Sequence, residues 1–171
     1  MTATLAERRP PAVFALLGTT RRRGAATGDT YESVDYGLTA LLLRAVRAAG
    51  PPWPRFVYLS ALGARAGAGS QYLAVRGRLE NELAAGPVPY TVARPSFITG
   101  PDRAESRPAE RVGAAVADAV LAPVRLLGAR RFADRLRSTT ADELAAALIR
   151  LAADPAAVGR TFEGDQLRPY S

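Results

Sequence analysis

The sequence predicts an α/β fold: a Rossmann-like parallel sheet with flanking helices, formed by a single domain. Short apolar runs at residues 12–17, 56–60 and 89–93 alternate with helical patterns. The first run, AVFALL, is continuously apolar, as in a strand that is buried on both faces. The length of 171 residues suits one domain, and the sequence has no internal repeat or dividing linker.

The N-terminal half divides at its glycines and prolines. We expect no ordered structure over residues 1–11, a strand over 12–17 and a polar, glycine-rich loop over 18–33. A helix is expected over 34–49, because the apolar spacing is helical there and Gly50 with two prolines ends it. The residues expected on the buried face of that helix are Leu38, Leu42, Ala45, Val46 and Ala49.

The C-terminal half continues the alternation. A strand over 56–60 is followed by a small-residue loop and then a helix over 71–85, which aligns Tyr72, Val75, Leu79 and Leu83. A third strand over 89–93 leads into an irregular loop over 97–108 and an alanine-rich helix over 109–127. A further helix is expected over 137–154, opened by a capping box of Thr140 and Glu143, and residues 160–163 predict a last short strand.

Composition excludes several classes of site. With no cysteine and no histidine, the chain can form no disulfide, thiol nucleophile, zinc–thiolate site or Ser-His-Asp triad. No apolar run approaches the ~18 residues of a membrane span, and the N-terminus lacks the apolar core of a signal peptide. We therefore expect a cytoplasmic protein with no membrane partner.

The net charge of +7 invites comparison with nucleic-acid-binding proteins. Every basic residue is arginine, however, and outside residues 8–9, 21–23 and 130–131 the arginines are scattered without interleaved aromatic rings. Solvated surface charge explains this pattern better than a nucleic-acid partner does.

Polar residues follow the ends of three expected strands. In open α/β sheets, ligands bind beyond the carboxyl ends of the strands. The segments at these ends are Gly18-Thr19-Thr20-Arg21, Ser60 and Arg94-Pro95-Ser96. A glycine directly after a buried strand would let a backbone approach a ligand closely, although such a glycine is more often only part of a turn.

Tyr72 and Arg76 share one face of the expected helix because they are four residues apart. A fixed cation beside a tyrosine favours the phenolate and makes the hydroxyl a better acid–base group. Ser60 could hydrogen-bond a substrate oxygen beside it. The alternative from spacing alone is a half-buried Tyr72 with a surface Arg76 that pairs with Glu80.

Taken in order, these motifs resemble the atypical short-chain dehydrogenase/reductase superfamily, and within it the Tat-interacting-protein-like oxidoreductase branch. The resemblance covers roughly residues 12–112, and the ordered set is more specific than any single motif. The matching segments are Leu17-Gly18-Thr19-Thr20-Arg21, Val34-Asp35, Leu59-Ser60, Gly63-Ala64, Tyr72-Leu73-x-Val75-Arg76-Gly77, Arg94-Pro95-Ser96 and Arg103-x-Glu105-Ser106-Arg107-Pro108.

The resemblance implies bound NAD or NADP and a small-molecule substrate, a carbonyl to be reduced or an alcohol to be oxidised. It would make Ser60 the residue that positions the carbonyl, Tyr72 the acid–base group and Arg76 the cation. It also implies a cofactor cleft and a loop on the substrate side. The cofactor cleft would involve Gly18, Thr19, Thr20, Arg21, Pro95 and Ser96, and the substrate-side loop Glu105 and Arg107.

The chain departs from the family in two ways. Arg76 stands where the family has lysine, and it is longer, planar and always charged. The family's first three strands, with their Gly-x-x-Gly-x-x-Gly turn for the pyrophosphate, have no counterpart, which describes an N-terminally truncated member. A misplaced start, a truncated gene and a fragment that pairs with another chain would each account for this.

These departures leave two functional classes and one question about partners open. The chain is either an active oxidoreductase or a non-catalytic dinucleotide-sensing or protein-interaction module. In the family's strand order, the 12–17 strand would present an exposed apolar edge, through which a second copy or a partner chain could pair. Neither the substrate nor the choice between NAD and NADP can be read from the sequence.

Overall fold

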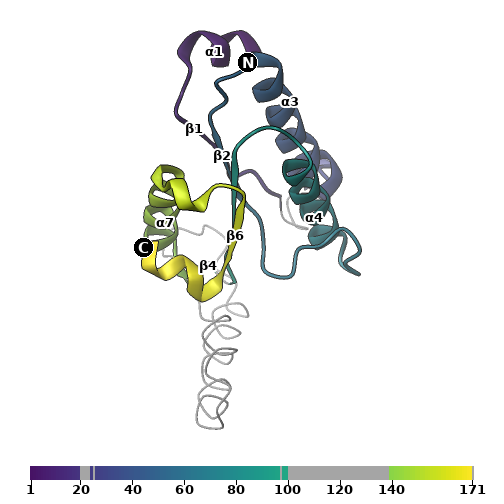
Figure 1. Cartoon of the computed structure of the whole chain (residues 1–171). Coiled ribbons are helices and arrows are strands. Elements are labelled where there is room, and N and C mark those ends of the chain that lie inside the picture. The colour runs from purple at the N-terminus through teal and green to yellow at the C-terminus, as the bar shows by residue number, and fades with distance from the viewer. Residues whose placement is uncertain (20–23, 25, 97, 100–138, 171) are drawn as a thin grey trace.

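The computed structural model describes residues 1–19, 24, 26–96, 98–99 and 139–170. Its centre is a parallel sheet of four strands in the order β1-β2-β3-β6 (Figure 1). The strands are β1 (Ala12–Ala15), β2 (Arg55–Leu59), β3 (Tyr90–Arg94) and β6 (Arg160–Glu163). The expected α/β fold with a parallel sheet is therefore confirmed, and β6 has the predicted bounds.

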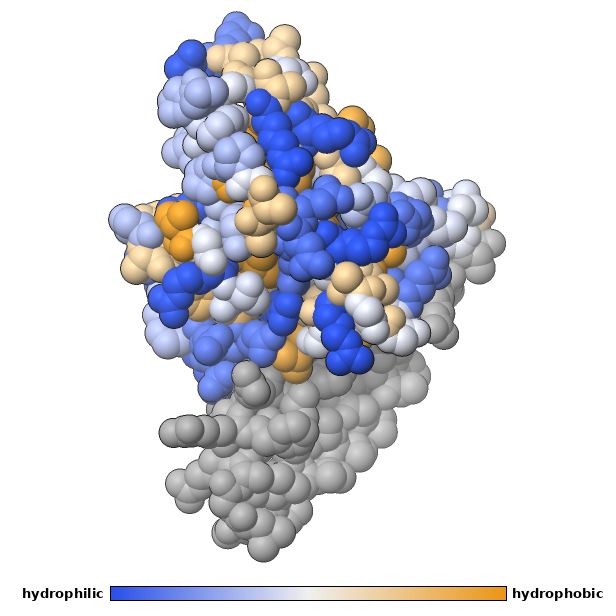
Figure 2. Space-filling model, turned by 45° about the vertical axis from the view of Figure 1, so that its right-hand side comes forward, coloured by the Kyte–Doolittle hydropathy of each residue, from blue (hydrophilic) through white to orange (hydrophobic). Residues whose placement is uncertain are grey.

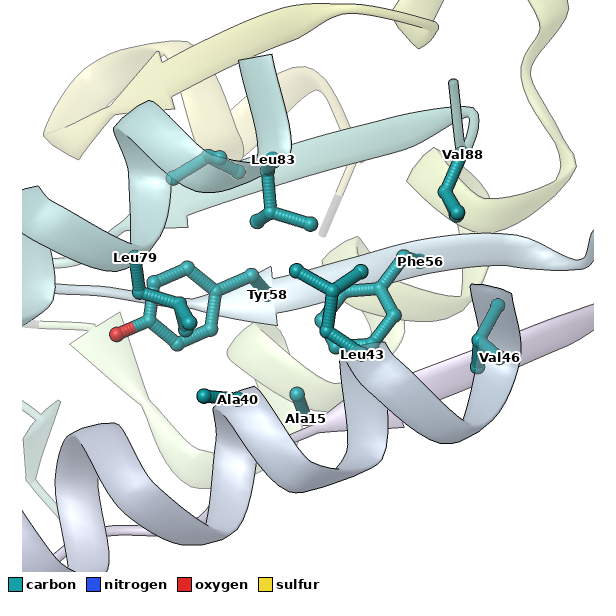
Figure 3. Close-up of a cluster of buried hydrophobic side chains, with 10 residues drawn as sticks. Ala15, Ala40, Leu43, Val46, Phe56, Tyr58, Leu79, Leu83 and Val88 are labelled. Carbon is teal, nitrogen blue, oxygen red and sulfur yellow. The ribbon is translucent and has the colours of Figure 1, made fainter. Parts of the chain in front are cut away.

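Successive side chains of a strand point to opposite faces of the sheet, so both faces here are apolar, and helices cover both of them. On one face, Phe56 and Tyr58 pack with Leu43 of α3 (Thr39–Ala49) and Leu79 of α4 (Gln71–Ala84) (Figure 3). On the other face, Val57 packs against α7 (Ala141–Ala153) and the 3₁₀ helix η3 (Gly164–Tyr170). A shorter 3₁₀ turn, η2 (Pro155–Ala157), joins α7 to β6.

The helix before α3 differs from the expectation. A π-helix, η1 (Tyr31–Leu38), begins three residues earlier than predicted, because Thr30 and Ser33 form a reciprocal capping box at its N-terminus. Ala45 and Val46 of α3 are buried as predicted, but a π-helical turn spans more residues than an α turn, so the predicted phase fails where η1 joins α3. Leu38 is therefore 44% exposed, whereas Leu43, which the prediction left out, is fully buried.

Several smaller elements complete the description. Residues 1–11, expected to lack order, contain α1 (Thr2–Arg8), and Leu5 of this helix packs against the core. The two-residue strands β4 (Ile98–Thr99) and β5 (Thr139–Thr140) pair in parallel, which the sequence did not indicate. The capping box of Thr140 and Glu143 at the start of α7 is confirmed. The helix expected over 109–127 lies outside the described residues.

β1 is the edge strand of the sheet, and within the described ranges no strand pairs with its outer side. It ends at Ala15 rather than at residue 17, and the next two residues are exposed. Together with Phe14, which is 39% exposed, Leu16 and Leu17 give this edge an apolar surface. On the face drawn in Figure 2, by contrast, hydrophilic residues are spread widely and apolar ones lie between them. No helix within the described ranges has the length and hydrophobicity that a membrane span requires.

Candidate functional site

Because the strands are parallel, three of the predicted segments lie together at the carboxyl ends of the strands. Gly18 and Thr19 follow β1, Ser60 follows β2, and Pro95 follows β3. Backbone hydrogen bonds join the last two segments: the Ser60 amide donates to the carbonyl of Ala93 at 2.8 Å, and the Leu62 amide donates to the carbonyl of Pro95 at 3.2 Å. The loop after β2 therefore runs alongside the end of β3.

Helix α4 carries Tyr72 and Arg76 to the same edge. The Arg76 guanidinium carbon, Cζ, lies 4.7 Å from the centroid of the Tyr72 ring. Arg76 Nη1 donates a hydrogen bond to the carbonyl of Leu59 at 2.6 Å, one residue before Ser60. Arg76 thus connects the end of β2 to Tyr72, and it is buried rather than on the surface.

The partner of Arg76 is Asp35 of η1, not Glu80 as in the alternative reading of the sequence. Arg76 Nη2 lies 2.7 Å from Asp35 Oδ1, and the Asp35 side chain is fully buried. The second oxygen, Oδ2, accepts a hydrogen bond from the Thr19 amide at 2.9 Å. Asp35 therefore ties the loop after β1 to α4. Sequence reasoning noted Asp35 only as part of a motif, and no local signal identified it as the partner of Arg76.

Gly18 makes room for this ion pair. A Cβ atom at position 18 would lie 2.8 Å from Arg76 Nη2 and 3.2 Å from Asp35 Oδ1. The sequence suggested that the missing side chain would admit the backbone near a ligand. In the structure, the Arg76 guanidinium takes up that space.

A cleft of about 300 Å³ opens beside this cluster. The rings of Tyr31 and Tyr72 meet in its wall with centroids 5.3 Å apart. Of the predicted site residues, Tyr72 and Thr19 line the cleft, whereas Ser60 and Pro95 do not. The full lining is Thr19, Gly24, Asp29, Thr30, Tyr31, Ser70, Gln71 and Tyr72. Most of these side chains carry a hydroxyl, amide or carboxylate group, so the cleft offers hydrogen-bonding groups beside apolar surface.

Two hydroxyl groups near this edge have unused hydrogen-bonding capacity. Ser60 is 3% exposed, and its Oγ has no hydrogen-bond partner among the described residues. The same holds for Thr19 Oγ1, whose residue also lines the cleft. A buried hydroxyl without a partner costs free energy, so both groups are candidates to bond a ligand.

The positive charge at the site is that of Arg76, which is paired with the Asp35 carboxylate. Burial works to lower the pKa of its guanidinium, but attraction to Tyr72, Tyr58 and Asp35 outweighs this effect and raises the pKa. Arg76 therefore stays charged at every accessible pH. Burial also raises the pKa of Tyr58, which lies beneath the cluster on β2, so this phenol remains protonated near neutral pH.

A second ionic cluster supports the ends of β3 and β6. Arg94 pairs with Glu80 of α4 and, at 2.6 Å, with Glu163 of β6, and it also donates to the carbonyl of Ala64 at 2.9 Å. Hydrogen bonds that Arg94 donates to these carboxylates, Glu80 first, raise the pKa of Arg94 against the opposing effect of burial. Arg94 therefore has a structural role, and Ser96 follows it at the end of β3.

Four of the predicted site residues cannot be located. Thr20, Arg21, Glu105 and Arg107 lie outside the described residues.

Comparison with known proteins supports the fold. The chain is similar to the terminal R domain from the myxalamid PKS-NRPS biosynthetic pathway, with a TM-score of 0.55 and 18% sequence identity. The likeness covers 94% of this chain and 44% of that domain. No protein-family model matches the chain. At this identity the likeness concerns the Rossmann-like architecture alone.

Two curated relatives are similar in sequence. Protein FMP52-1, mitochondrial, of Scheffersomyces stipitis is 37% identical over 90 residues, which are 52% of this chain and 38% of the relative. Protein fmp52, mitochondrial, of Aspergillus niger is 36% identical over 105 residues, 60% of this chain and 43% of the relative. The matched stretches thus span about two fifths of the relatives. Both relatives are named as mitochondrial proteins, which contradicts the cytoplasmic location expected from the sequence.

Proposed function

We propose that this chain is an NAD(P)-dependent oxidoreductase of the short-chain dehydrogenase/reductase type, which reduces a small carbonyl or oxidises an alcohol. One observation carries the proposal. The Arg76 cation, held in place by Asp35 and the Leu59 carbonyl, lies against the ring of Tyr72. Tyr72 lines a cleft with mostly polar side chains at the carboxyl ends of the strands. The Rossmann-like fold, shared with the R domain, supports it.

Tyr72 is the acid–base group in this reaction. During reduction its hydroxyl gives a proton to the oxygen of the carbonyl, and during oxidation its phenolate takes the proton from the alcohol. The charge of Arg76 beside the ring favours the phenolate. Ser60 does not line the cleft, but its buried Oγ has no partner among the described residues, so it is our candidate to bond the same oxygen. The nicotinamide supplies or accepts the hydride when it is bound.

The described residues fit the nicotinamide end of a dinucleotide. Thr19 lines the cleft and its buried Oγ1 has no partner among the described residues, while Pro95 and Ser96 follow the end of β3. Gly18 contributes indirectly, because the space beside it holds Arg76. Roles for Thr20 and Arg21 in cofactor binding, and for Glu105 and Arg107 on the substrate side, stay predictions.

The first test is cofactor binding followed by turnover. NADH and NADPH are titrated calorimetrically against the purified chain, and small aldehydes and ketones are then screened by loss of reduced-nicotinamide absorbance. Tyr72→Phe should keep cofactor affinity and lower turnover about 100-fold or more, the usual contribution of a general acid. Tyr90→Phe is the matched control, since it removes a hydroxyl from the first residue of β3, at the opposite end of the strand from the site. Equal turnover of Tyr72→Phe and the wild type would refute the assignment.

A second class, a non-catalytic dinucleotide-sensing or protein-interaction module, is favoured by the pairing of Arg76. The Arg76 guanidinium is paired with the fully buried Asp35 carboxylate and does not interact with Tyr72 alone. Arg76→Lys separates the two classes. A lapsed enzyme should gain turnover when lysine is restored, whereas a pure binding module should show cofactor affinity and no turnover with either residue.

The expected pairing with a second copy or a partner chain also stays a prediction, and the apolar edge of β1 supports it. Sedimentation velocity of the purified chain should show a concentration-dependent dimer, and Phe14→Lys should weaken it, because a charge at an edge opposes strand pairing. A wild type that remains monomeric across the accessible concentration range would exclude self-pairing.

A further inference from the structure

We propose that Asp35 offsets the charge of Arg76, so that the two side chains act on Tyr72 as a nearly neutral pair. This inference rests on the proposed role of Tyr72 as the acid–base group. In this arrangement, Asp35 influences the ionisation of Tyr72 without touching the substrate. Its carboxylate weakens the effect that the positive charge of Arg76 has on Tyr72.

The first support is the closeness of the pair. Asp35 Oδ1 is 2.7 Å from Arg76 Nη2, and the side chains are 0% and 7% exposed, respectively. Solvent therefore screens their interaction only weakly, and each charge strongly compensates the other. Any group a few ångströms away responds to the sum of the two charges rather than to the cation alone.

The second support is that neither partner can move away. Arg76 is bound to the Leu59 carbonyl through Nη1, and its Cζ lies 4.7 Å from the Tyr72 ring centroid. Asp35 receives the Thr19 amide on its other oxygen at 2.9 Å. Gly18 leaves no space between its backbone and the pair, since a Cβ there would lie 2.8 Å from Arg76 Nη2. The pair is thus fixed in position beneath Tyr72.

Other ionisable groups face Tyr72 and remain constant in the comparison below. Tyr31 of η1 contacts its ring, Asp29 lies in the same cleft wall, and Tyr58 of β2 interacts with Arg76 from below. The nearby pairs Arg78–Glu32 and Tyr36–Glu82 join α4 to η1 farther along the helix. None of these groups is altered, so differences between the variants report on Asp35 and Arg76.

The test is a charge cycle on the full chain with no cofactor or substrate present. Tyrosine labelled with ¹³C at Cζ is incorporated, and the pH titration of Tyr72 is followed by NMR, with Tyr72→Phe used to assign its resonance. The variants are Asp35→Asn, Arg76→Gln and the two combined. Asp35→Asn removes a charge with little change of shape, whereas Arg76→Gln removes the charge and also shortens the side chain.

Each variant has a defined expectation. Asp35→Asn leaves the cation alone and should lower the ionisation midpoint of Tyr72 by roughly one pH unit, within the range that a single nearby charge produces. Arg76→Gln leaves the carboxylate alone and should raise the midpoint by a similar amount. The wild type and the double variant should fall between the two. A purely structural role for Asp35 would not reverse the sign in this way.

An Asp35→Asn midpoint equal to or above that of the wild type would overturn the proposal. If Asp35→Asn fails to fold because Arg76 is left buried and unpaired, Arg76→Gln and the double variant still decide the matter. The ionisation midpoint of Tyr72 should then be higher in Arg76→Gln, which keeps the Asp35 carboxylate, than in the double variant, which lacks it. Equal midpoints in these two variants would overturn the proposal. Because no turnover is measured, a chain without reductase activity would refute the proposed function and leave this test intact.

Discussion

Replacing Gly18 with alanine tests whether the guanidinium of Arg76 is fixed as the structure indicates. The added Cβ would lie 2.8 Å from Nη2 of Arg76, closer than side-chain carbons approach a nitrogen, and 3.2 Å from Oδ1 of Asp35. The end of an arginine side chain usually moves aside at little cost. Here it is held by the Leu59 carbonyl at 2.6 Å and by Asp35, so backbone must shift or a buried bond must break. Overpacking of this kind costs about 1–3 kcal/mol.

Urea unfolding, followed by far-ultraviolet circular dichroism, measures this loss. Gly67→Ala is the matched control, because a Cβ at this exposed loop position has no heavy atom within 4 Å. The control should change the free energy of unfolding by less than about 1 kcal/mol, with stabilisation the favoured direction. If Gly18→Ala unfolds at the same urea concentration as the wild type, Arg76 is not confined beside Gly18 and the argument for a fixed pair fails.

Three further predictions concern stability. Arg94→Leu should lower the free energy of unfolding by about 3 kcal/mol near neutral pH, because it leaves Glu80 and Glu163 partly buried without their cation. Urea unfolding measures this loss, and an unchanged free energy of unfolding would contradict this cause. Thr140→Ala should cost about 1 kcal/mol in urea unfolding through loss of the helix cap, and no loss would mean that the cap is dispensable. Burial raises the pKa of Tyr58, so the unfolded chain loses its phenolic proton first and stability falls as the pH rises above about 10. Tyr58→Phe should flatten that alkaline decline in thermal unfolding, and an unchanged decline would assign it to other groups.

Local signals were sufficient for most of the fold. The apolar runs that became β2 and β3 were placed to within one residue at each end, and β6 had its predicted bounds. Thr140 was correctly read as a cap because the capping box is a contact within four residues. The π-helical start of η1 was not predicted. Its register depends on burying Asp35 opposite Arg76, a contact between residues 41 positions apart that helical periodicity cannot encode.

The relative placement of Tyr72 and Arg76 was predicted better than the contacts that they make. Spacing placed Tyr72 and Arg76 on one helix face, and the distance between them bears this out. Spacing also suggested Glu80 as the partner of Arg76, since i,i+4 pairs are the ones a sequence displays. The structure instead pairs Glu80 with Arg94 and Arg76 with Asp35, because the sheet brings these distant residues together. Partner choice in a buried ion pair is a property of the tertiary fold.

The arginine at position 76 fits its surroundings too closely to be treated as a simple substitute for lysine. Its planar head bonds the Leu59 carbonyl with one nitrogen and Asp35 with another, while its face lies over Tyr72. A lysine ammonium is one nitrogen, and it could satisfy these partners only by moving to a point between them. Arg76→Lys should therefore change two things together: the support given to the Thr19 loop through Asp35, and the charge felt by Tyr72. A gain in turnover with a lower melting temperature would mean that the Arg76–Asp35 pair stabilises the site but lowers its turnover. A loss of both would mean that the guanidinium is the form of cation this site is built to use.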